Sequence, residues 1–155
     1  MIQRIQSIFL FLVSILMGVT IFLPLWGKSD GTNRIEIDTM HMVELSSGEV
    51  VSEQTTVYLA IIAGLTALLA LWNVFNFKNR RFQMKIGLFC TLLIAVFIAV
   101  EVFLTFQGQA AFAPEVGGNF AYGFFLPVGA ILLNWMAIRA IKRDEDMVRS
   151  ADRLR

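Results

Sequence analysis

The sequence is poor in the side chains on which much enzyme chemistry depends. Cys90 is the only cysteine among 155 residues and lies inside an apolar run, so neither an intramolecular disulfide nor a Cys-x-x-Cys motif is present. This absence excludes a self-contained thiol-disulfide enzyme. His41 is the only histidine, and serine nucleophiles without a histidine partner are weak, so a hydrolase is not expected.

Recognisable binding motifs are also missing. The sequence has no His-Glu-x-x-His, no Gly-x-Ser-x-Gly and no Gly-rich phosphate loop ahead of a lysine. His41 has Asp38 and Glu44 three residues to either side, but on a strand that offset puts the histidine on the opposite face from both acids. We therefore predict no metal site, no cofactor and no catalytic residues.

Charged residues are scarce, at 16% of the chain, whereas hydrophobic residues make up 57% and phenylalanine occurs 14 times. Residues 8–26 form a run of 19 without a charge. A span of roughly 20 apolar residues matches a bilayer core of about 30 Å. The composition therefore indicates an integral membrane protein.

Apolar segments predict four transmembrane helices, at about residues 8–26, 57–77, 86–106 and 120–141. We therefore expect an all-α membrane protein whose residues 1–155 form one domain. The first segment begins like a secretory signal peptide. Its length and the absence of an Ala-x-Ala cleavage pattern favour a retained helix.

The basic turn at residues 78–85 sets the predicted orientation, because lysine and arginine are retained on the cytoplasmic side during insertion. This turn carries Lys78, Arg80, Arg81 and Lys85. By alternation, residues 27–54 form an outer loop, residues 107–119 an outer connection, and both termini are cytoplasmic. Of the 13 lysine and arginine residues, the 2 at positions 28 and 34 fall on outer segments, and the other 11 lie on the cytoplasmic side.

Two of the segments outside the helices show patterns of their own. In the outer loop, alternation at residues 34–38 and a turn at residues 46–49 favour a short β-hairpin. The tail at residues 142–155 is expected to continue the last helix into the cytoplasm, either as a solvated extension or as a surface for the membrane or a partner. From residue 139 onward, 6 basic residues face 4 acidic ones, a balance too small for nucleic acid.

The chain resembles a bacterial family of four-helix membrane proteins known as a domain of unknown function. The resemblance rests on the opening MIQRIQS (residues 1–7), the central residues 78–80, the segments at residues 122–127 and 137–145, and the close VRSADRLR (residues 148–155), in which RSADRLR is the most specific part. It spans the whole chain and implies a bacterial inner-membrane protein with four spans. It implies no activity and no binding residues.

Glu101 is the one acidic residue inside a predicted span. At about 1.5 Å per residue it lies roughly 22 Å from the cytoplasmic edge and about 8 Å from the outer edge. An ionisable group at that depth suggests proton coupling, ion binding or recognition of a cationic ligand. The structural alternative is a hydrogen bond with Tyr58 or Tyr122, or contact with water in a small vestibule.

Asparagines inside the predicted spans are expected to be structural. Asn134 lies near the middle of the fourth segment, and Asn73 and Asn76 lie toward the inner end of the second. Buried amides usually bond between helices and contribute about 0.6–2 kcal/mol each.

Two classes of function remain, and we favour the first. It is a non-enzymatic accessory, assembly or interaction subunit of an inner-membrane complex, which docks other subunits or further copies through small-residue helix faces, the outer loop or the tail. The alternative is a small oligomeric transporter or channel subunit in which Glu101 couples a proton or cation. Transporters normally place several polar groups around one cavity, whereas Glu101 stands alone. An enzyme acting on a lipid or quinone would need a second titratable group near Glu101.

Overall fold

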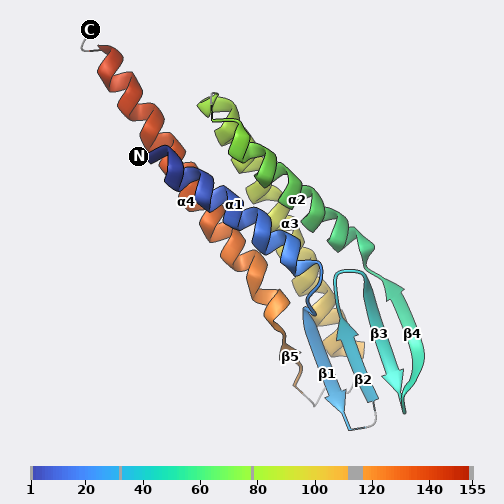
Figure 1. Ribbon diagram of the computed structural model, residues 1–155. Helices are drawn as coiled ribbons and strands as arrows, with labels where there is room; N and C mark the ends of the chain where they lie inside the picture. Colours follow the sequence, from blue (N-terminus) through green and yellow to red (C-terminus); the bar gives the residue numbers. More distant parts are fainter. Residues whose placement is uncertain (1, 32, 78, 112–116, 154–155) are drawn as a thin grey trace.

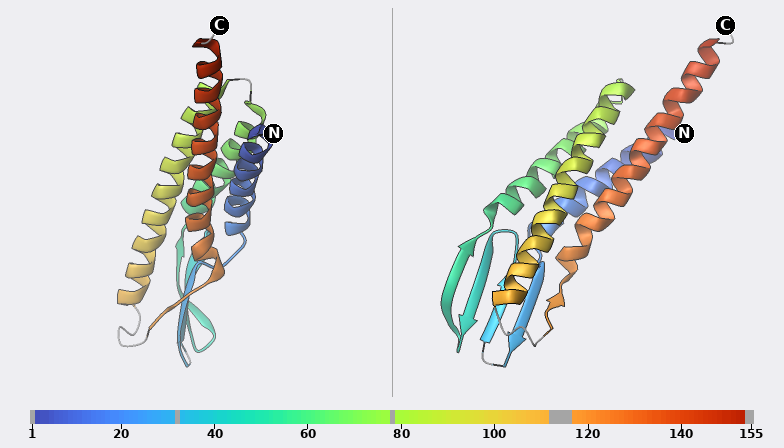
Figure 2. Two further views of the ribbon diagram at one scale, coloured as in Figure 1. Left: turned by 90° about the vertical axis from the view of Figure 1, so that its left-hand side faces the viewer. Right: turned by 180° about the vertical axis from the view of Figure 1, so that it is seen from behind.

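The computed structural model describes residues 2–31, 33–77, 79–111 and 117–153. Four helices form a bundle: α1 (Ile2–Thr20), α2 (Val57–Phe75), α3 (Arg80–Ala111) and α4 (Tyr122–Arg153). A sheet lies at one end of the bundle, and both termini lie toward the other end (Figure 1; Figure 2). Its strands are β1 (Trp26–Asp30), β2 (Asn33–Ile37), β3 (His41–Ser46), β4 (Glu49–Thr55) and β5 (Asn119–Phe120).

The prediction of an all-α protein is wrong, because the expected outer loop folds as most of an antiparallel sheet. The strand order is β4-β3-β2-β1-β5. Trp26 pairs with Ile37 on one side and with Phe120 on the other, so β1 joins segments that are far apart in the sequence. Neither β1 nor the two-residue β5 has the alternating pattern of a strand, and their pairing depends on the fold around them.

The predicted hairpin is confirmed at residues 46–49, but it forms one part of a larger sheet. It joins β3 to β4 through Ser47 and Gly48. Both residues have positive φ angles, 53° and 88° respectively, a conformation that glycine adopts at little cost.

Thr39 connects the sheet to two helices at the end of the bundle. Its Oγ1 donates to the carbonyl of Ile21 at 2.8 Å, just beyond α1. Its own carbonyl accepts from the N–H of Ala60 at 3.2 Å, in the first turn of α2. Thr56 Oγ1 donates to the carbonyl of Asp38 at 3.1 Å, and both threonines are fully buried. The connection between β2 and β3 is therefore fixed against the bundle.

Trp26 fixes the sheet against α3 and is 2% exposed. Sequence analysis placed residues 8–26 in one helix, but α1 ends at Thr20 and Trp26 begins β1. A Cβ atom at Gly108 would lie 2.9 Å from Trp26 Cζ3, and one at Gly118 would overlap the same ring. The indole ring therefore occupies a slot that two glycines keep open.

Within the described ranges, three helices are long and apolar enough to span a membrane: Val57–Phe75, Arg80–Ala110 and Tyr122–Val148. The apolar part of α1, Ile5–Thr20, is shorter. The 32 residues of α3 measure about 48 Å at 1.5 Å each, which exceeds the bilayer core of about 30 Å. The last turns of α3 lie beside one face of the sheet (Figure 1; Figure 2). The expected helical continuation of the last segment is confirmed, since α4 continues to Arg153.

Buried amides join the helices, as predicted for Asn134 and Asn73. Asn134 Nδ2 donates to the Gly87 carbonyl and to Thr91 Oγ1, both at 2.8 Å, and so links α4 to α3. Asn73 Nδ2 donates to the Gln83 carbonyl at 3.1 Å, and Gln83 Nε2 donates back to the Asn73 carbonyl at the same distance. Asn76 instead bonds within the end of α2.

Candidate functional site

Glu101 is buried in the bundle, with 1% of the residue exposed. Neither carboxylate oxygen has a hydrogen-bond partner among the described residues. Thr105 Oγ1 donates to the main-chain carbonyl of Glu101 at 3.0 Å and does not bond the side chain. A buried carboxylate without a partner is costly, so this position calls for an explanation beyond packing.

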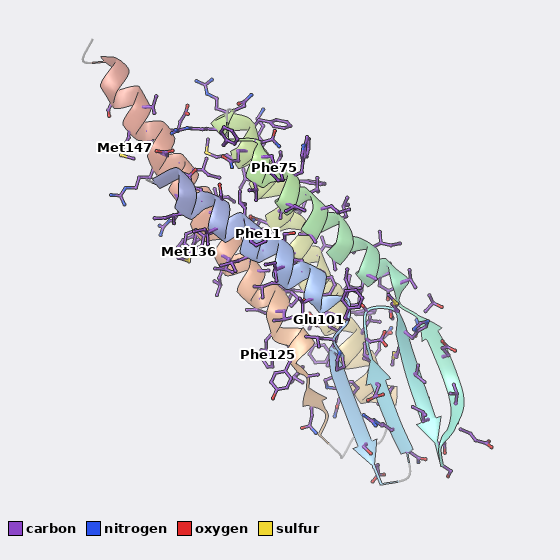
Figure 3. The ribbon with its side chains drawn as sticks, viewed as in Figure 1. Phe11, Phe75, Glu101, Phe125, Met136 and Met147 are labelled. Atoms are coloured by element: carbon purple, nitrogen blue, oxygen red, sulfur yellow. The ribbon has the colours of Figure 1, made fainter. Side chains whose placement is uncertain are left out.

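Apolar side chains occupy the helix face that carries Glu101. Phe97 and Leu104, one turn to either side, both belong to the buried core. Figure 3 places Glu101 near the end of the bundle that adjoins the sheet. The predicted tyrosine partners, Tyr58 and Tyr122, are both described and exposed, and neither bonds the Glu101 carboxylate. The structural alternative based on tyrosine is therefore wrong.

No titratable side chain forms an ion pair or hydrogen bond with the Glu101 carboxylate in the part of the chain that the structure describes. An acid–base pair at this position is therefore absent from those residues. A cavity of about 330 Å³ lies one turn closer to the sheet, lined by Thr105, Phe106 and Trp26 among others. Glu101 itself is not among the residues that line this cavity.

The basic residues of the predicted turn begin α3 at the end of the bundle opposite the sheet. Arg80 pairs with Asp144 of α4 at 2.7 Å, and Arg81 approaches Glu145 at 3.5 Å. Lys85 is exposed on the next turn, whereas Lys78 lies outside the described residues. These contacts give Arg80 and Arg81 a second role, because they attach α3 to the helical tail.

His41 lies at the start of β3 beside an acidic turn. Asp38 Oδ1 accepts from the main-chain N–H of Met40 at 2.7 Å and of His41 at 2.6 Å. The imidazole Nε2 lies 3.7 Å from a carboxylate oxygen of Glu53 across the β3–β4 pair. Within the described ranges, no group of three metal-ligating side chains is brought together.

The outer edge of β4 is a surface that sequence analysis missed. All seven residues of β4 are exposed, and the strand is at one end of the sheet order. Its residues show no hydrophobic alternation because neither face is buried, so periodicity could not reveal it. The turn at Ser47 and Gly48 was the available signal, since it requires a strand on each side.

The hydrogen-bond register fixes which β4 groups point away from the sheet. The N–H of Thr56 donates to the carbonyl of Met40 at 2.8 Å, and this pair continues the register in which Met42 opposes Gln54. Because bonded pairs alternate in an antiparallel ladder, the main-chain groups of Glu53 and Thr55 point toward the open edge. β4 thus offers donors and acceptors to one further strand.

A family model described as "Domain of unknown function (DUF4293)" matches residues 2–154. The chain belongs to this family. The match includes all four helices and the sheet, so the predicted resemblance to a family of unknown function is confirmed. No curated protein and no solved structure matches the chain.

Proposed function

We propose that the protein is a non-enzymatic subunit inserted in the bacterial inner membrane, where it docks another subunit of a membrane complex. In this arrangement the four helices cross the bilayer, the sheet faces outward, and both termini are cytoplasmic. Three helices of membrane-spanning length support insertion. The position of Arg80 and Arg81 at the end away from the sheet supports this orientation.

The observation that carries the docking function is the open edge of β4. An exposed sheet edge binds an extended segment through main-chain hydrogen bonds, and neighbouring side chains select its sequence. Glu53 and Thr55 direct their main-chain groups to that edge, and Val50 and Val51 expose apolar side chains beside it. β4 thus combines main-chain hydrogen-bonding groups that face the open edge with exposed apolar side chains.

The charges on this edge favour a basic partner strand over a second copy of the same strand. β4 carries Glu49 and Glu53, and the adjoining β3 carries Glu44. Two β4 strands placed edge to edge would bring like charges together, which destabilises a strand pair. We therefore infer that the occupant is an extended, lysine- or arginine-bearing segment of a different membrane subunit.

A photoreactive amino acid in place of Thr55, in cells that express the full chain, tests this function by crosslinking. We expect a specific adduct whose cross-linked peptide is a basic extended segment of one membrane subunit. Glu53→Pro removes an outward N–H and should reduce the adduct at least about tenfold, because proline blocks strand addition at an edge. Glu53→Asp keeps both that N–H and the negative charge and should retain most of the adduct.

The same photo-crosslinker placed at Ser29 is the matched control, because Ser29 is exposed on β1 and lies away from the β4 edge. The docking function is overturned if Thr55 yields no more adduct than Ser29, if Glu53→Pro leaves the yield unchanged, or if the cross-linked peptide belongs to a second copy of this chain.

Glu101 supports a second candidate function, that of a transporter or channel subunit. The observation in its favour is a buried carboxylate whose two oxygens have no partner among the described residues. Reconstituted liposomes containing a pH-sensitive dye measure whether the protein carries protons. This function predicts a flux above that of empty liposomes and its loss, by at least about tenfold, in Glu101→Gln. Equal flux in the two proteins excludes the coupling role.

A further inference from the structure

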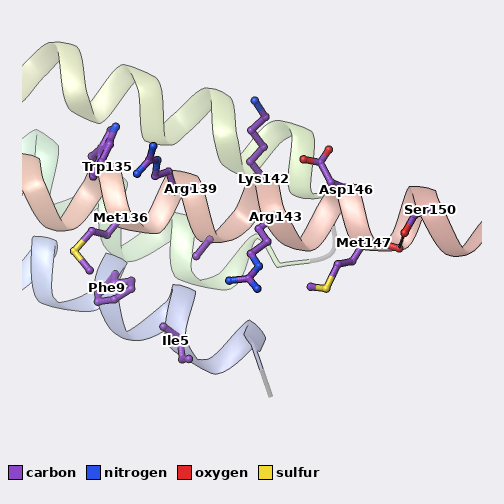
Figure 4. Close-up of a pocket in the computed structure, with 11 residues that line it drawn as sticks. Ile5, Phe9, Trp135, Met136, Arg139, Lys142, Arg143, Asp146, Met147 and Ser150 are labelled. Carbon is purple, nitrogen blue, oxygen red and sulfur yellow. Dashed lines mark hydrogen bonds between the residues drawn. The ribbon is translucent and has the colours of Figure 1, made fainter.

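A groove lies between α1 and α4 at the end of the bundle opposite the sheet. Its volume is about 1140 Å³ (Figure 4). The walls toward the middle of the bundle are apolar and come from both helices, with Ile5 and Phe9 on α1 and Trp135 and Met136 on α4. Figure 4 shows Phe9 and Met136 directed toward one another between the helices. Gln6 Nε2 donates to the Ala140 carbonyl at 3.1 Å, which ties the two walls together.

Cationic residues of α4 line the same groove at the end farther from the middle of the bundle. Arg139, Lys142 and Arg143 contribute three positive charges and Asp146 one negative charge, which leaves a lining charge of +2. Arg139 stacks on Trp135, with its guanidinium carbon 4.0 Å from the ring centroid. Lys142 and Arg143 are consecutive residues of α4, about 100° apart around the helix, and their side chains extend away from each other at the groove (Figure 4).

Two acidic residues of the tail face away from these cations. Asp144 and Glu145 turn toward α3, where they pair with Arg80 and Arg81. In the described part of the chain, no ion pair joins an acid to Arg139, Lys142 or Arg143. Because Asp144 and Glu145 pair with α3, the part of the groove lined by the α4 cations keeps a net positive charge.

The height of the cations along α4 matches a lipid headgroup region. If α4 enters the bilayer at Tyr122, about 20 residues carry it across the hydrocarbon core to residue 141. Arg139, Lys142 and Arg143 then lie at the inner interface, where anionic headgroups attract lysine and arginine. Trp135 lies one turn deeper, at the boundary that tryptophan prefers.

We propose that this groove binds one anionic phospholipid of the leaflet that faces the termini. Its phosphate lies among Arg139, Lys142 and Arg143, and an acyl chain follows Phe9 and Met136 into the bilayer. The proposal rests on membrane insertion, as does the proposed function, but it does not depend on the β4 docking edge. Charge complementarity and the continuous apolar wall select a lipid over a soluble phosphate.

Native mass spectrometry of the full chain tests the proposal. The protein is released from nanodiscs that contain equal amounts of phosphatidylglycerol and phosphatidylcholine with the same acyl chains. We expect one retained phosphatidylglycerol and a preference of about tenfold or more over phosphatidylcholine, as three interfacial cations would give. The double variant Arg139→Gln/Arg143→Gln should lose most of this preference.

Lys85→Gln is the matched control, because Lys85 is an exposed cation at the same end of the bundle but does not line the groove. It should keep the full preference. Thermal unfolding in nanodiscs of phosphatidylcholine alone checks that each variant folds. Equal retention of the two lipids overturns the proposal, as does a preference that survives the double substitution or is lost equally in Lys85→Gln. Failure of the protein to enter nanodiscs would instead overturn membrane insertion.

Discussion

Replacing Gly123 with alanine is expected to lower the free energy of unfolding by about 3 kcal/mol. A Cβ atom there would lie 2.5 Å from the Pro24 carbonyl oxygen and 3.1 Å from that of Leu23. Both oxygens belong to the main chain between α1 and β1, which cannot rotate aside as a side chain can. The N–H of Gly123 also donates to the Pro24 carbonyl at 3.2 Å. The added methyl group would therefore push α4 away from the junction of bundle and sheet.

Gly129→Ala is the control within the same helix. Its Cβ atom would lie 3.6 Å from Leu16 Cδ1, an ordinary van der Waals contact. Alanine is the better helix former, so this change should raise the free energy of unfolding by about 0.5–1 kcal/mol. Titration with sodium dodecyl sulfate, followed by circular dichroism, measures both variants. Equal midpoints for Gly123→Ala and the unsubstituted protein would contradict the close approach of α4 to Pro24.

Replacing Glu101 with methionine is expected to raise the free energy of unfolding by about 1–3 kcal/mol. Methionine is of similar size and flexible, and it removes a buried polar group that has no partner among the described residues. Its neighbours on the helix face, Phe97 and Leu104, are apolar and suit a thioether side chain. The same detergent titration measures the change.

Leu104→Met is the matched control, since it introduces the same side chain one turn away at a buried apolar position. It should lower the free energy of unfolding by less than about 1.5 kcal/mol. A larger loss in Glu101→Met than in Leu104→Met would show that a bound ion, water or partner satisfies the carboxylate. A stabilised protein that also loses proton flux would identify Glu101 as a residue retained for function at the expense of stability.

Several features of the fold could be predicted because they depend on neighbours in sequence. The apolar runs predicted all four helices, and the buried amides Asn73 and Asn134 join helices as expected. The turn at Gly48 predicted a hairpin from a local conformational requirement. The helix limits were less accurate, since α1 ends six residues before the predicted limit at residue 26.

The sheet could not be predicted in full because its pairing is non-local. β5 joins β1 across more than half of the chain, with Phe120 opposite Trp26. The sequence placed Trp26 at the end of the first predicted helix, whereas packing between Gly108 and Gly118 buries it in the sheet. The spacing of these glycines from Trp26 has no period that could reveal the contact.

Of the candidate sites, the sequence identified Glu101, but not that both of its carboxylate oxygens lack a hydrogen-bond partner among the described residues. It also identified the cations of α4, but not the groove that they line. By itself the sequence determined the apolar helices and the positions of the charges, since hydropathy and charge are properties of single segments. The tertiary structure decided which groups meet. It buried Glu101 with no hydrogen-bond partner for its carboxylate among the described residues, turned Asp144 toward α3, and left β4 as an open edge. Such pairings depend on the packing of distant segments, and no local pattern encodes them.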